Sequence, residues 1–189
     1  FNENDGLIIG EGGMVLISSD GGFNWQKVSI GTNVDLNALS VLDENSAIAV
    51  SQSSAVFKTV DKGLNWEQIQ TGFDMPLTDI EFLDESVGFI TGENGLIIRT
   101  FDAGENWERL ETATFQNFTG ISFGDLNVGY AVGENGLLFQ YTCQVPDVIP
   151  TIFGEDNICI SQQIYSVQDF GLEGVEYDWR VDGGTVIQG

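Results

Sequence analysis

The residues best suited to chemistry in this 189-residue chain are aspartates that return at a fixed spacing. Asp20, Asp61 and Asp102 are 41 residues apart, and each is followed by a glycine two residues later and by a tryptophan five residues later. Repeated carboxylates of this kind could ligate a cation or act as general acids and bases. The row of tryptophans could likewise stack on sugar rings.

The alternative role for these residues is structural, and the sequence favours it. At a tight corner a carboxylate accepts hydrogen bonds from backbone N–H groups, a glycine takes a conformation that a Cβ atom forbids, and a tryptophan covers the turn. Because each group recurs at one position of a repeat, we expect every tryptophan to form the local core of its own hairpin. No residue is assigned a catalytic or metal-binding role. The residues assigned to the structural corners are Ser18, Asp20, Gly22, Trp25, Thr59, Asp61, Gly63, Trp66, Thr100, Asp102, Gly104 and Trp107.

Composition excludes several classes of function. The chain has no histidine, which removes the commonest general base and metal ligand and any Ser-His or Cys-His nucleophile. It has 29 Asp and Glu against 6 Lys and Arg, a formal net charge of −23, while a hydrophobic fraction of 42% still indicates a globular chain. Nucleic acids and anionic membranes are bound through Lys and Arg, so neither is an expected partner, and no apolar run is long enough for membrane insertion.

Two weaker chemical interpretations stay open. Acidic turns recur at Asp43, Asp84 and Asp125, and oxygen-rich turns can bind calcium weakly, although no dedicated calcium loop is present. Carboxylate pairs at the separations that glycoside hydrolases use must also occur among so many acids. We therefore expect no resident cofactor, with weakly bound calcium as the alternative.

The hydrophobic pattern predicts the elements that position these residues. Within each 41-residue unit, apolar residues alternate in short runs separated by turn residues, which is typical of β-strands. In the third unit the expected strands are 78–82, 87–91, 96–100 and 106–110, with a two-residue hairpin turn at Asn94-Gly95. Four antiparallel strands in a unit of this length predict a β-propeller blade, and hence an all-β chain.

The corner sequence Ser/Thr-x-Asp-x-Gly-x-x-Trp resembles the Asp-box, or BNR repeat, of sialidase-type propellers. The whole unit is more similar to the repeats of the photosystem II assembly factor family, over residues 1–142. This resemblance implies a propeller fold and a function in protein assembly. The sialidases hold the substrate carboxylate with an arginine triad and use a Tyr-Glu pair as the nucleophile. The chain departs from them, because its arginines are only Arg99, Arg109 and Arg180. Its acidic composition also departs from the basic surface patch of the assembly factors.

The repeat is incomplete at both ends. The position equivalent to Asp102 in the fourth unit is Cys143, and Val148 stands where the tryptophan would be, so we expect that unit to lack its outer strand. The first unit begins near the end of its own first strand. The sequence thus predicts about three and a half four-stranded blades, the C-terminal part of a ring of roughly six to eight, with further blades before residue 1.

A different pattern follows the repeats. Residues 143–150 contain two of the three prolines and predict a short linker. Residues 151–189 resemble the first half of a PKD-like immunoglobulin-type β-sandwich of Bacteroidota surface proteins. That resemblance places Tyr177, Trp179 and Val181 on the core face of its central strand.

The two cysteines bear on the compartment. Cys143 and Cys159 enclose 15 residues, and a disulfide between them would stabilise the chain by roughly 3 kcal/mol in an oxidising compartment. Two separate thiols fit the sequence equally well.

The expected function is that of a non-catalytic interaction or scaffold segment of a large secreted or cell-surface protein, such as an adhesin, fibre or sheath component. Its propeller would present a binding surface to a protein or a glycan, beside further blades and modules of the same polypeptide. The strong acidity suits an extracellular surface that stays soluble. The alternative is a propeller glycoside hydrolase or lyase whose catalytic residues lie mainly in other blades. An assembly chaperone, as the family resemblance implies, is a third hypothesis.

Overall fold

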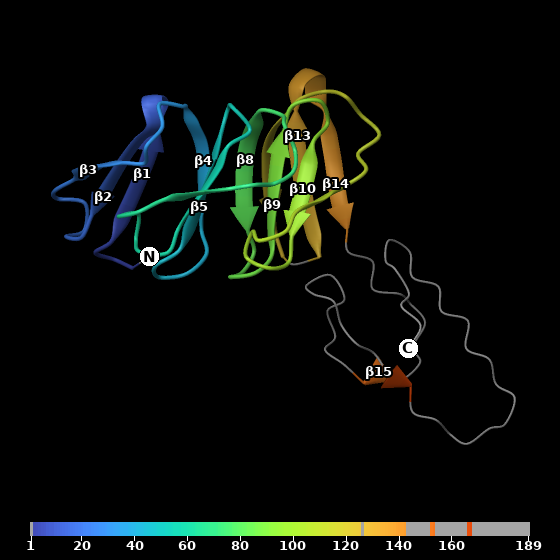
Figure 1. Ribbon diagram of the computed structural model, residues 1–189. Helices are drawn as coiled ribbons and strands as arrows, with labels where there is room; N and C mark the ends of the chain where they lie inside the picture. Colours follow the sequence, from blue (N-terminus) through green and yellow to red (C-terminus); the bar gives the residue numbers. More distant parts are fainter. Residues whose placement is uncertain (1, 126, 143–151, 154–165, 168–189) are drawn as a thin grey trace, which may run out of the picture. The chain divides into compact units, whose positions relative to one another are not determined.

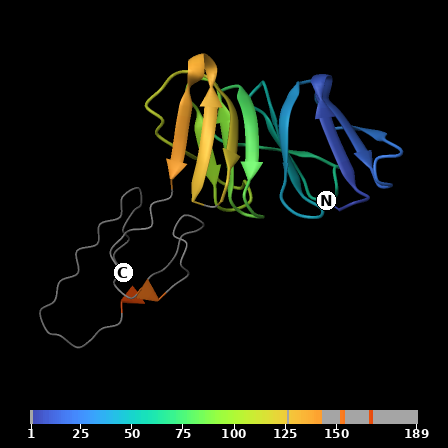
Figure 2. The same cartoon turned by 180° about the vertical axis from the view of Figure 1, so that it is seen from behind.

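The computed structural model of this chain is built from antiparallel β-sheets that follow one another along the sequence (Figure 1). It describes residues 2–125, 127–142, 152–153 and 166–167. Four sheets stand in a row up to residue 142, each with its strands in sequence order (Figures 1 and 2). This part of the chain is therefore a partial β-propeller, as the 41-residue repeat predicted.

We call the four sheets blades 1 to 4, in chain order. Blade 1 contains the strands β1 (Gly6–Gly10), β2 (Met14–Ser18) and β3 (Gln26–Ser29). Blade 2 contains β4 (Leu36–Val41), β5 (Ala47–Ser51), β6 (Val56–Thr59) and β7 (Glu67–Ile69). Blade 3 contains β8 (Leu77–Phe82), β9 (Gly88–Gly92), β10 (Ile97–Thr100) and β11 (Glu108–Arg109). Blade 4 contains β12 (Phe118–Phe123), β13 (Val128–Gly133) and β14 (Leu138–Thr142). Single 3-10 turns, η1 (Glu11–Gly13) and η2 (Glu134–Gly136), connect β1 to β2 and β13 to β14.

Alternation along the strands gives each blade two faces. In blade 3, Ile80, Ile90 and Ile98 are cross-strand partners on the face toward blade 2. Phe89 and Ile97 pack on the opposite side, against blade 4. We call the face toward the preceding blade the leading face, and the face toward the following blade the trailing face. A blade with a neighbour on each side must be apolar at successive positions, which is why β9 and β10 are buried along most of their length.

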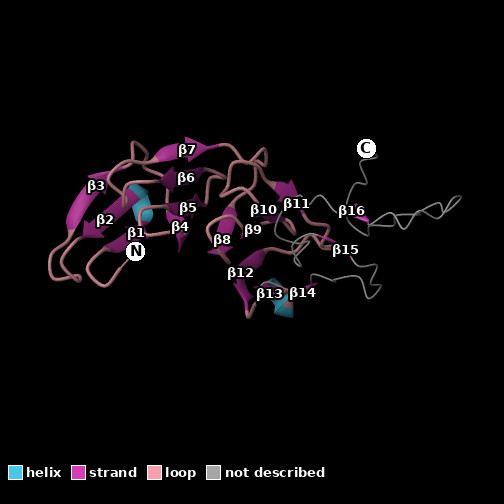
Figure 3. Ribbon diagram, turned by 90° about the horizontal axis from the view of Figure 1, so that it is seen from below, coloured by secondary structure: helices cyan, strands magenta, loops and turns pink. Residues whose placement is uncertain are grey.

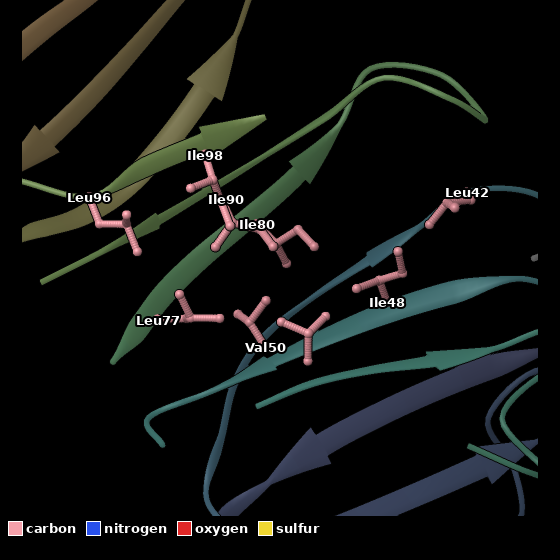
Figure 4. Close-up of a cluster of buried hydrophobic side chains, with 9 residues drawn as sticks. Leu42, Ile48, Val50, Leu77, Ile80, Ile90, Leu96 and Ile98 are labelled. Carbon is pink, nitrogen blue, oxygen red and sulfur yellow. The ribbon is translucent and has the colours of Figure 1, made fainter. Parts of the chain in front are cut away.

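The hydrophobic core lies in the seams between blades. The seam between blades 2 and 3 is made of aliphatic side chains from both, and Figure 4 shows most of them gathered between the two sheets. Each fully buried side chain of this size stabilises the fold by about 1.5–3 kcal/mol. Similar seams join blades 1 and 2 around Phe57 and blades 3 and 4 around Phe89. The buried residues of the seam between blades 2 and 3 are Leu42, Ile48, Val50, Val56, Leu77, Ile80, Ile90, Leu96 and Ile98.

Hydrogen bonds join the first strands of neighbouring blades. The Ser40 hydroxyl accepts a bond from the backbone N–H of Phe82 (3.0 Å), and the Asn37 amide donates one to the carbonyl of Leu77 (2.7 Å). Figure 3 shows β4, β8 and β12 next to one another along one side of the row, with β3, β7 and β11 on the other. The first strands therefore fix the spacing of the blades.

The turn between the second and third strands depends on left-handed backbone conformations. In blade 3, Asn94 and Gly95 have φ angles of 55° and 69°, which confirms the expected Asn-Gly hairpin. The Gly95 N–H also donates to the carbonyl of Gln116, in the segment that leads into blade 4. A Cβ atom on Gly95 would lie 2.0 Å from the carbonyl oxygen of Thr114, so position 95 requires glycine.

Replacing Gly95 by alanine is therefore expected to destabilise the chain by about 2–4 kcal/mol, because a backbone clash adds to left-handed strain. Gly136→Ala is the matched control. Gly136 occupies the same position in blade 4 with a φ of 77° and nothing within 4 Å of the added Cβ, so only the strain of about 1–2 kcal/mol remains. Urea unfolding measures the difference, and equal losses in the two variants would contradict the clash.

The ends of the row also follow the repeat. Within the described residues, blade 1 begins with the equivalent of β5 and blade 4 ends with the equivalent of β10. Two four-stranded and two three-stranded blades confirm the predicted three and a half. The strands of blade 3 lie within two residues of their predicted bounds, and β11 is the shortest because residues 104–107 belong to the corner before it.

The remaining described residues belong to a separate unit. They are two short antiparallel strands, β15 (Ile152–Phe153) and β16 (Ser166–Val167). The predicted linker 143–150, the rest of the predicted PKD-like module within 151–189, and both Cys143 and Cys159 lie outside the described residues. In the part of the chain that is described, no helix has the length and apolar character needed to cross a membrane.

Candidate functional site

The repeated aspartates lie at the corner after the third strand of a blade, where they organise the backbone. In blade 3, Asp102 Oδ1 accepts hydrogen bonds from the Thr100 hydroxyl and from the backbone N–H of Asn106, both at 2.8 Å. Asp102 Oδ2 accepts a third bond from the Asn106 side chain at 2.7 Å. The Thr100 hydroxyl accepts from the Gly104 N–H (3.0 Å), and the Trp107 indole donates to the Gly104 carbonyl (2.9 Å). These five residues form one network.

The same network recurs in blades 1 and 2. The bond from the asparagine side chain is 2.6 Å long at Asp20 and 2.7 Å long at Asp61, and the indole bonds are 2.9 Å and 3.0 Å long. All twelve residues assigned to the corners from the sequence take part in these networks. The asparagine was missed, although its recurrence was a signal that could have identified it. The three corner asparagines are Asn24, Asn65 and Asn106.

The corner hydrogen bonds also keep the carboxylates ionised. Side-chain and backbone bonds from Asn65 hold the pKa of Asp61 below its ordinary value. Burial raises the pKa of Asp102, but the hydrogen bonds from Asn106, Thr100 and Glu105 together outweigh this effect and the net pKa is lowered. A carboxylate with a lowered pKa, surrounded by donors from its own corner, is a poor proton donor. The geometry is that of a structural corner.

Corners 2 and 3 also pack against the preceding blade. A Cβ atom on Gly104 would lie 2.8 Å from Ile48 Cδ1 of blade 2, and Gly63 is equally close to blade 1. Trp66 and Trp107 join the hydrophobic seams that link their blades to the preceding ones. The indoles of Trp66 and Trp107 donate to the glycines of their own corners, and the two side chains also pack in the seams between blades, a contact that the sequence did not predict.

The tips of the corners carry apolar side chains that face solvent. Phe23 and Leu64 occupy the same position in corners 1 and 2 and are 89% and 54% exposed. Val60, next to the aspartate of corner 2, is 66% exposed. We call Phe23, Val60 and Leu64 the tip residues. Because two of them recur at one position of the repeat, the tip residues are candidates for contacts with a partner.

A groove of about 400 Å³ lies between corners 1 and 2. Lys62 Nζ forms an ion pair with Asp5 Oδ2 at 2.6 Å beside it. This hydrogen bond holds the pKa of Asp5 below its ordinary value. The wall of the groove is part aromatic, part aliphatic and part charged, and neutral polar side chains complete it: Ser18, Ser19, Asn24 and Gln26. Its main lining residues are Asp5, Ile17, Asp20, Trp25, Lys62 and Leu64.

Two further carboxylates, on β8, bind blade 3 to blade 4. Asp79 Oδ2 accepts the backbone N–H of Ile121 (2.9 Å), and Glu81 Oε2 accepts that of Phe123 (3.1 Å). Burial raises the pKa of Glu81, although the bond from Phe123 partly offsets this effect. A shallow depression of about 240 Å³ lies beside Glu81. Sequence analysis missed this pair because the acids occur in one unit only and leave no repeated signal.

The recurring acidic turns use their carboxylates locally. Asp84 Oδ1 accepts the backbone N–H groups of Ser86 and Val87, each at 2.7 Å, and Asp43 and Asp125 accept equivalent bonds. Within the described ranges, no group of three or more Asp, Glu, His or Cys side chains is placed to hold a metal ion.

The arginines do not form the cluster that a sialidase needs. Arg99 and Arg109 are both in blade 3, on adjacent positions of the β10–β11 ladder and therefore on opposite faces. Arg99 bonds to Glu108 and to the Tyr141 hydroxyl. Arg180 lies outside the described residues.

A protein-family model matches the repeats. The family model described as photosynthesis system II assembly factor YCF48 matches residues 1–71 and 64–142, which together cover the four blades. No curated protein sequence matches the chain.

Several solved structures resemble the chain. A structure described as YCF48 bound to D1 peptide is 20% identical and covers 75% of this chain and 48% of its own, with a TM-score of 0.64. YCF48 from Cyanidioschyzon merolae is 16% identical and covers 70% and 45%, with a TM-score of 0.60. An ancestral GH74 enzyme is 20% identical and covers 76% and 24%, with a TM-score of 0.52. The chain spans about half the length of the two YCF48 structures, and at these identities the likeness shows the fold.

Proposed function

This chain belongs to the photosynthesis system II assembly factor YCF48 family, and on that premise we propose that it is a non-catalytic, protein-binding segment of a β-propeller. One YCF48 structure holds a D1 peptide, which supports a protein segment as the ligand. The corner aspartates support a non-catalytic function, because their carboxylates already accept hydrogen bonds from the asparagines of their own corners.

The exposed tip residues are the observation that carries this proposal. Phe23 and Leu64 recur at one corner position and contribute little to the core. Phenylalanine and leucine side chains that become buried on binding supply much of the affinity of a protein interface. A surface that combines them with a net charge of −23 suits a partner that is apolar at its anchors and basic around them.

Selection of random dodecapeptides displayed on phage against the immobilised chain tests this function. Clones selected on the wild-type chain are expected to bind the double variant Phe23→Ser/Leu64→Ser about ten-fold more weakly or worse, because both anchors are lost. The matched control is Phe115→Ser. Phe115 is 86% exposed, in the loop that docks on the β9–β10 turn and not at the corners.

The possible outcomes test two claims separately: that the tip residues form the binding surface, and that the chain binds proteins at all. Selected clones that bind wild type and the double variant equally would show that the tips are not the binding surface. A selection that enriches no clone over a chain-free surface would contradict the protein-binding function itself.

The proposal extends to the context of the segment. We propose a secreted or cell-surface protein, with a protein or glycan ligand and with further blades of the same polypeptide completing the ring. The acidity supports an extracellular surface. A hydrolase or lyase is the alternative; it would take its catalytic residues mainly from other blades, since Asp79 and Glu81 already hold blade 4.

The assignment of structural residues and domains is part of the same proposal. The twelve corner residues are structural, residues 1–142 are propeller blades, 143–150 a linker and 151–189 a PKD-like half-module. A disulfide between Cys143 and Cys159 fits the secreted location.

We also propose that the acidic turns at Asp43, Asp84 and Asp125 bind calcium weakly, since they recur at the same position of successive blades. Removal of calcium with EDTA is then expected to lower the Tm by roughly 2–4 °C, the shift that about 1 kcal/mol of ligand stabilisation produces in a chain of this size. Differential scanning calorimetry with and without millimolar calcium measures this shift. An unchanged Tm would remove calcium from the proposal.

A further inference from the structure

Two hairpin turns of the chain have the same sequence and nearly the same φ angles. Gly-Glu-Asn-Gly-Leu occurs at residues 92–96, between β9 and β10, and again at residues 133–137, between β13 and β14. Asn94 and Asn135 have φ angles of 55° and 54°, and the glycines that follow them have φ angles of 69° and 77°. A difference in chemical reactivity between the two turns in the folded chain must therefore come from their surroundings.

An Asn-Gly pair can react without an enzyme. The glycine nitrogen loses its proton to a solvent base and attacks Cγ of the asparagine, which closes a five-membered succinimide ring. The side-chain nitrogen takes up a proton from water and leaves as ammonia. Water then adds to one of the two succinimide carbonyls, and the C–N bond at that carbonyl breaks to give aspartate or isoaspartate. Glycine favours the attack because it has no side chain to hinder it.

In blade 3 the segment that leads into blade 4 holds this turn closed. The Gly95 N–H donates to the Gln116 carbonyl at 2.9 Å, and the Thr112 hydroxyl donates to the Gly95 carbonyl at 2.8 Å. The Asn94 N–H donates to Asn117 Oδ1 at 3.0 Å. Gly95 is buried. The nitrogen that would attack is thus both covered and hydrogen-bonded.

In blade 4 the same turn is open to solvent. Asn135 and Gly136 are both exposed, and a Cβ atom added to Gly136 would meet nothing within 4 Å. Among the described residues, no hydrogen bond joins Asn135 or Gly136 to another segment. The turn is held from one side only, where the Glu134 N–H donates to the Asn117 carbonyl at 3.0 Å. The three bonds that hold the blade 3 turn have no counterpart in this part of the structure.

The backbone of the turn has to open before the reaction can start. Asn135 has a ψ angle of 29°, which directs the Gly136 nitrogen away from Cγ of the asparagine. The ring can close only after rotation about this bond. Segments with an exposed backbone and few contacts open at a low cost in free energy, and additional hydrogen bonds raise that cost. The rate of the reaction therefore depends on how firmly each turn is held.

We propose that Asn135 is a site of spontaneous deamidation and isoaspartate formation, and that the loop at residues 112–117 protects Asn94 from the same reaction. The product carries a new carboxylate next to Glu134. Isoaspartate also inserts Cβ into the backbone of a tight hairpin turn, so the β13–β14 pairing of the deamidated chain is loosened. This inference does not depend on the proposed protein-binding function.

Incubation of the full chain in mildly alkaline buffer, followed by peptide mapping with mass spectrometry, tests the site. In the folded chain Asn135 is expected to deamidate about ten-fold faster than Asn94 or more, because opening of the blade 3 turn breaks three additional hydrogen bonds. In concentrated urea the two rates are expected to become equal, because the flanking residues are identical. Equal rates in the folded chain would overturn the proposal. So would an Asn135 that stays intact while the unfolded chain reacts.

A variant of the protecting loop gives a second test. Thr112→Val keeps the shape of the side chain but removes the hydroxyl that donates to Gly95. It is expected to raise the rate at Asn94 about five-fold, with Asn135 unchanged as the internal control. An unchanged rate at Asn94 would contradict the protection by this loop.

The loosened hairpin is tested by amide hydrogen exchange. Exchange in β14 is expected to be faster in the isoaspartate form than in Asn135→Asp, which gains the charge without the additional backbone atom. Equal exchange in the two forms would show that the turn accommodates isoaspartate, and would overturn this part of the inference.

Discussion

Phe89→Ala is expected to cost about 3–5 kcal/mol and to loosen blade 4 from blade 3. The Phe89 ring is 1% exposed and packs against Phe123 and Tyr141, with ring centroids 4.4 Å and 5.1 Å away. Its removal leaves a cavity between two rigid sheets that cannot close around it. Urea unfolding measures the loss of stability, and amide hydrogen exchange is expected to show the largest loss of protection in β12, β13 and β14.

The repeat supplies a matched control for this variant. Tyr130 stands at the same position in blade 4, 41 residues later, and is 45% exposed because no described blade covers that face. Tyr130→Ala is expected to change stability by less than about 1 kcal/mol. A similar cost at both positions would mean that the blades, not the seams between them, carry the stability.

Asp102→Ala is expected to destabilise the chain by about 2–3 kcal/mol, because three hydrogen bonds to a charged acceptor are lost at a partly exposed corner. Asp102→Asn keeps one carbonyl oxygen for Thr100 and the Asn106 N–H, but it loses the charge and faces the Asn106 amide with a second amide. We expect about half the cost for this variant. Asp74→Ala removes a carboxylate that accepts a single bond, from Ser54, and serves as the control.

The same variant predicts a dependence on pH. The folded pKa of Asp102 lies below its unfolded value, so its contribution is fully present above the unfolded pKa and is lost as pH falls through the folded pKa. The difference in unfolding free energy between wild type and Asp102→Ala is therefore expected to be largest near neutral pH and to shrink in acid. A difference that stayed constant down to pH 2 would show that the charge of Asp102 contributes nothing.

The repeat made the strands and corners predictable. Strands with apolar residues on both faces and the hydroxyl, aspartate, glycine and tryptophan of each corner recur at 41-residue steps, and the Asn94-Gly95 hairpin recurs once, at Asn135-Gly136. A motif that recurs three times at a constant spacing predicts a strand or a corner even when the contacts between blades are unknown. For that reason the sequence predicted the blades and their corners almost to the residue.

Features that depend on one unit were not predictable in the same way. Asp79 and Glu81 look like ordinary surface acids, and only the register between β8 and β12 shows that they hold backbone N–H groups of the next blade. The groove between corners 1 and 2 is likewise lined by residues of both blades, and a strand pattern does not show which residues of two blades come together.

The constant register of the seams limits how such a chain can change in length during evolution. In each seam the trailing face of one blade, which contains Leu7, Ile48 or Phe89, packs against the apolar leading face of the next blade. Duplication or loss of a whole 41-residue unit would therefore join two surfaces that already fit, whereas a single-residue insertion within a strand would turn its core side chains outward. We therefore expect related chains to differ in length by whole blades more often than by single residues within a strand.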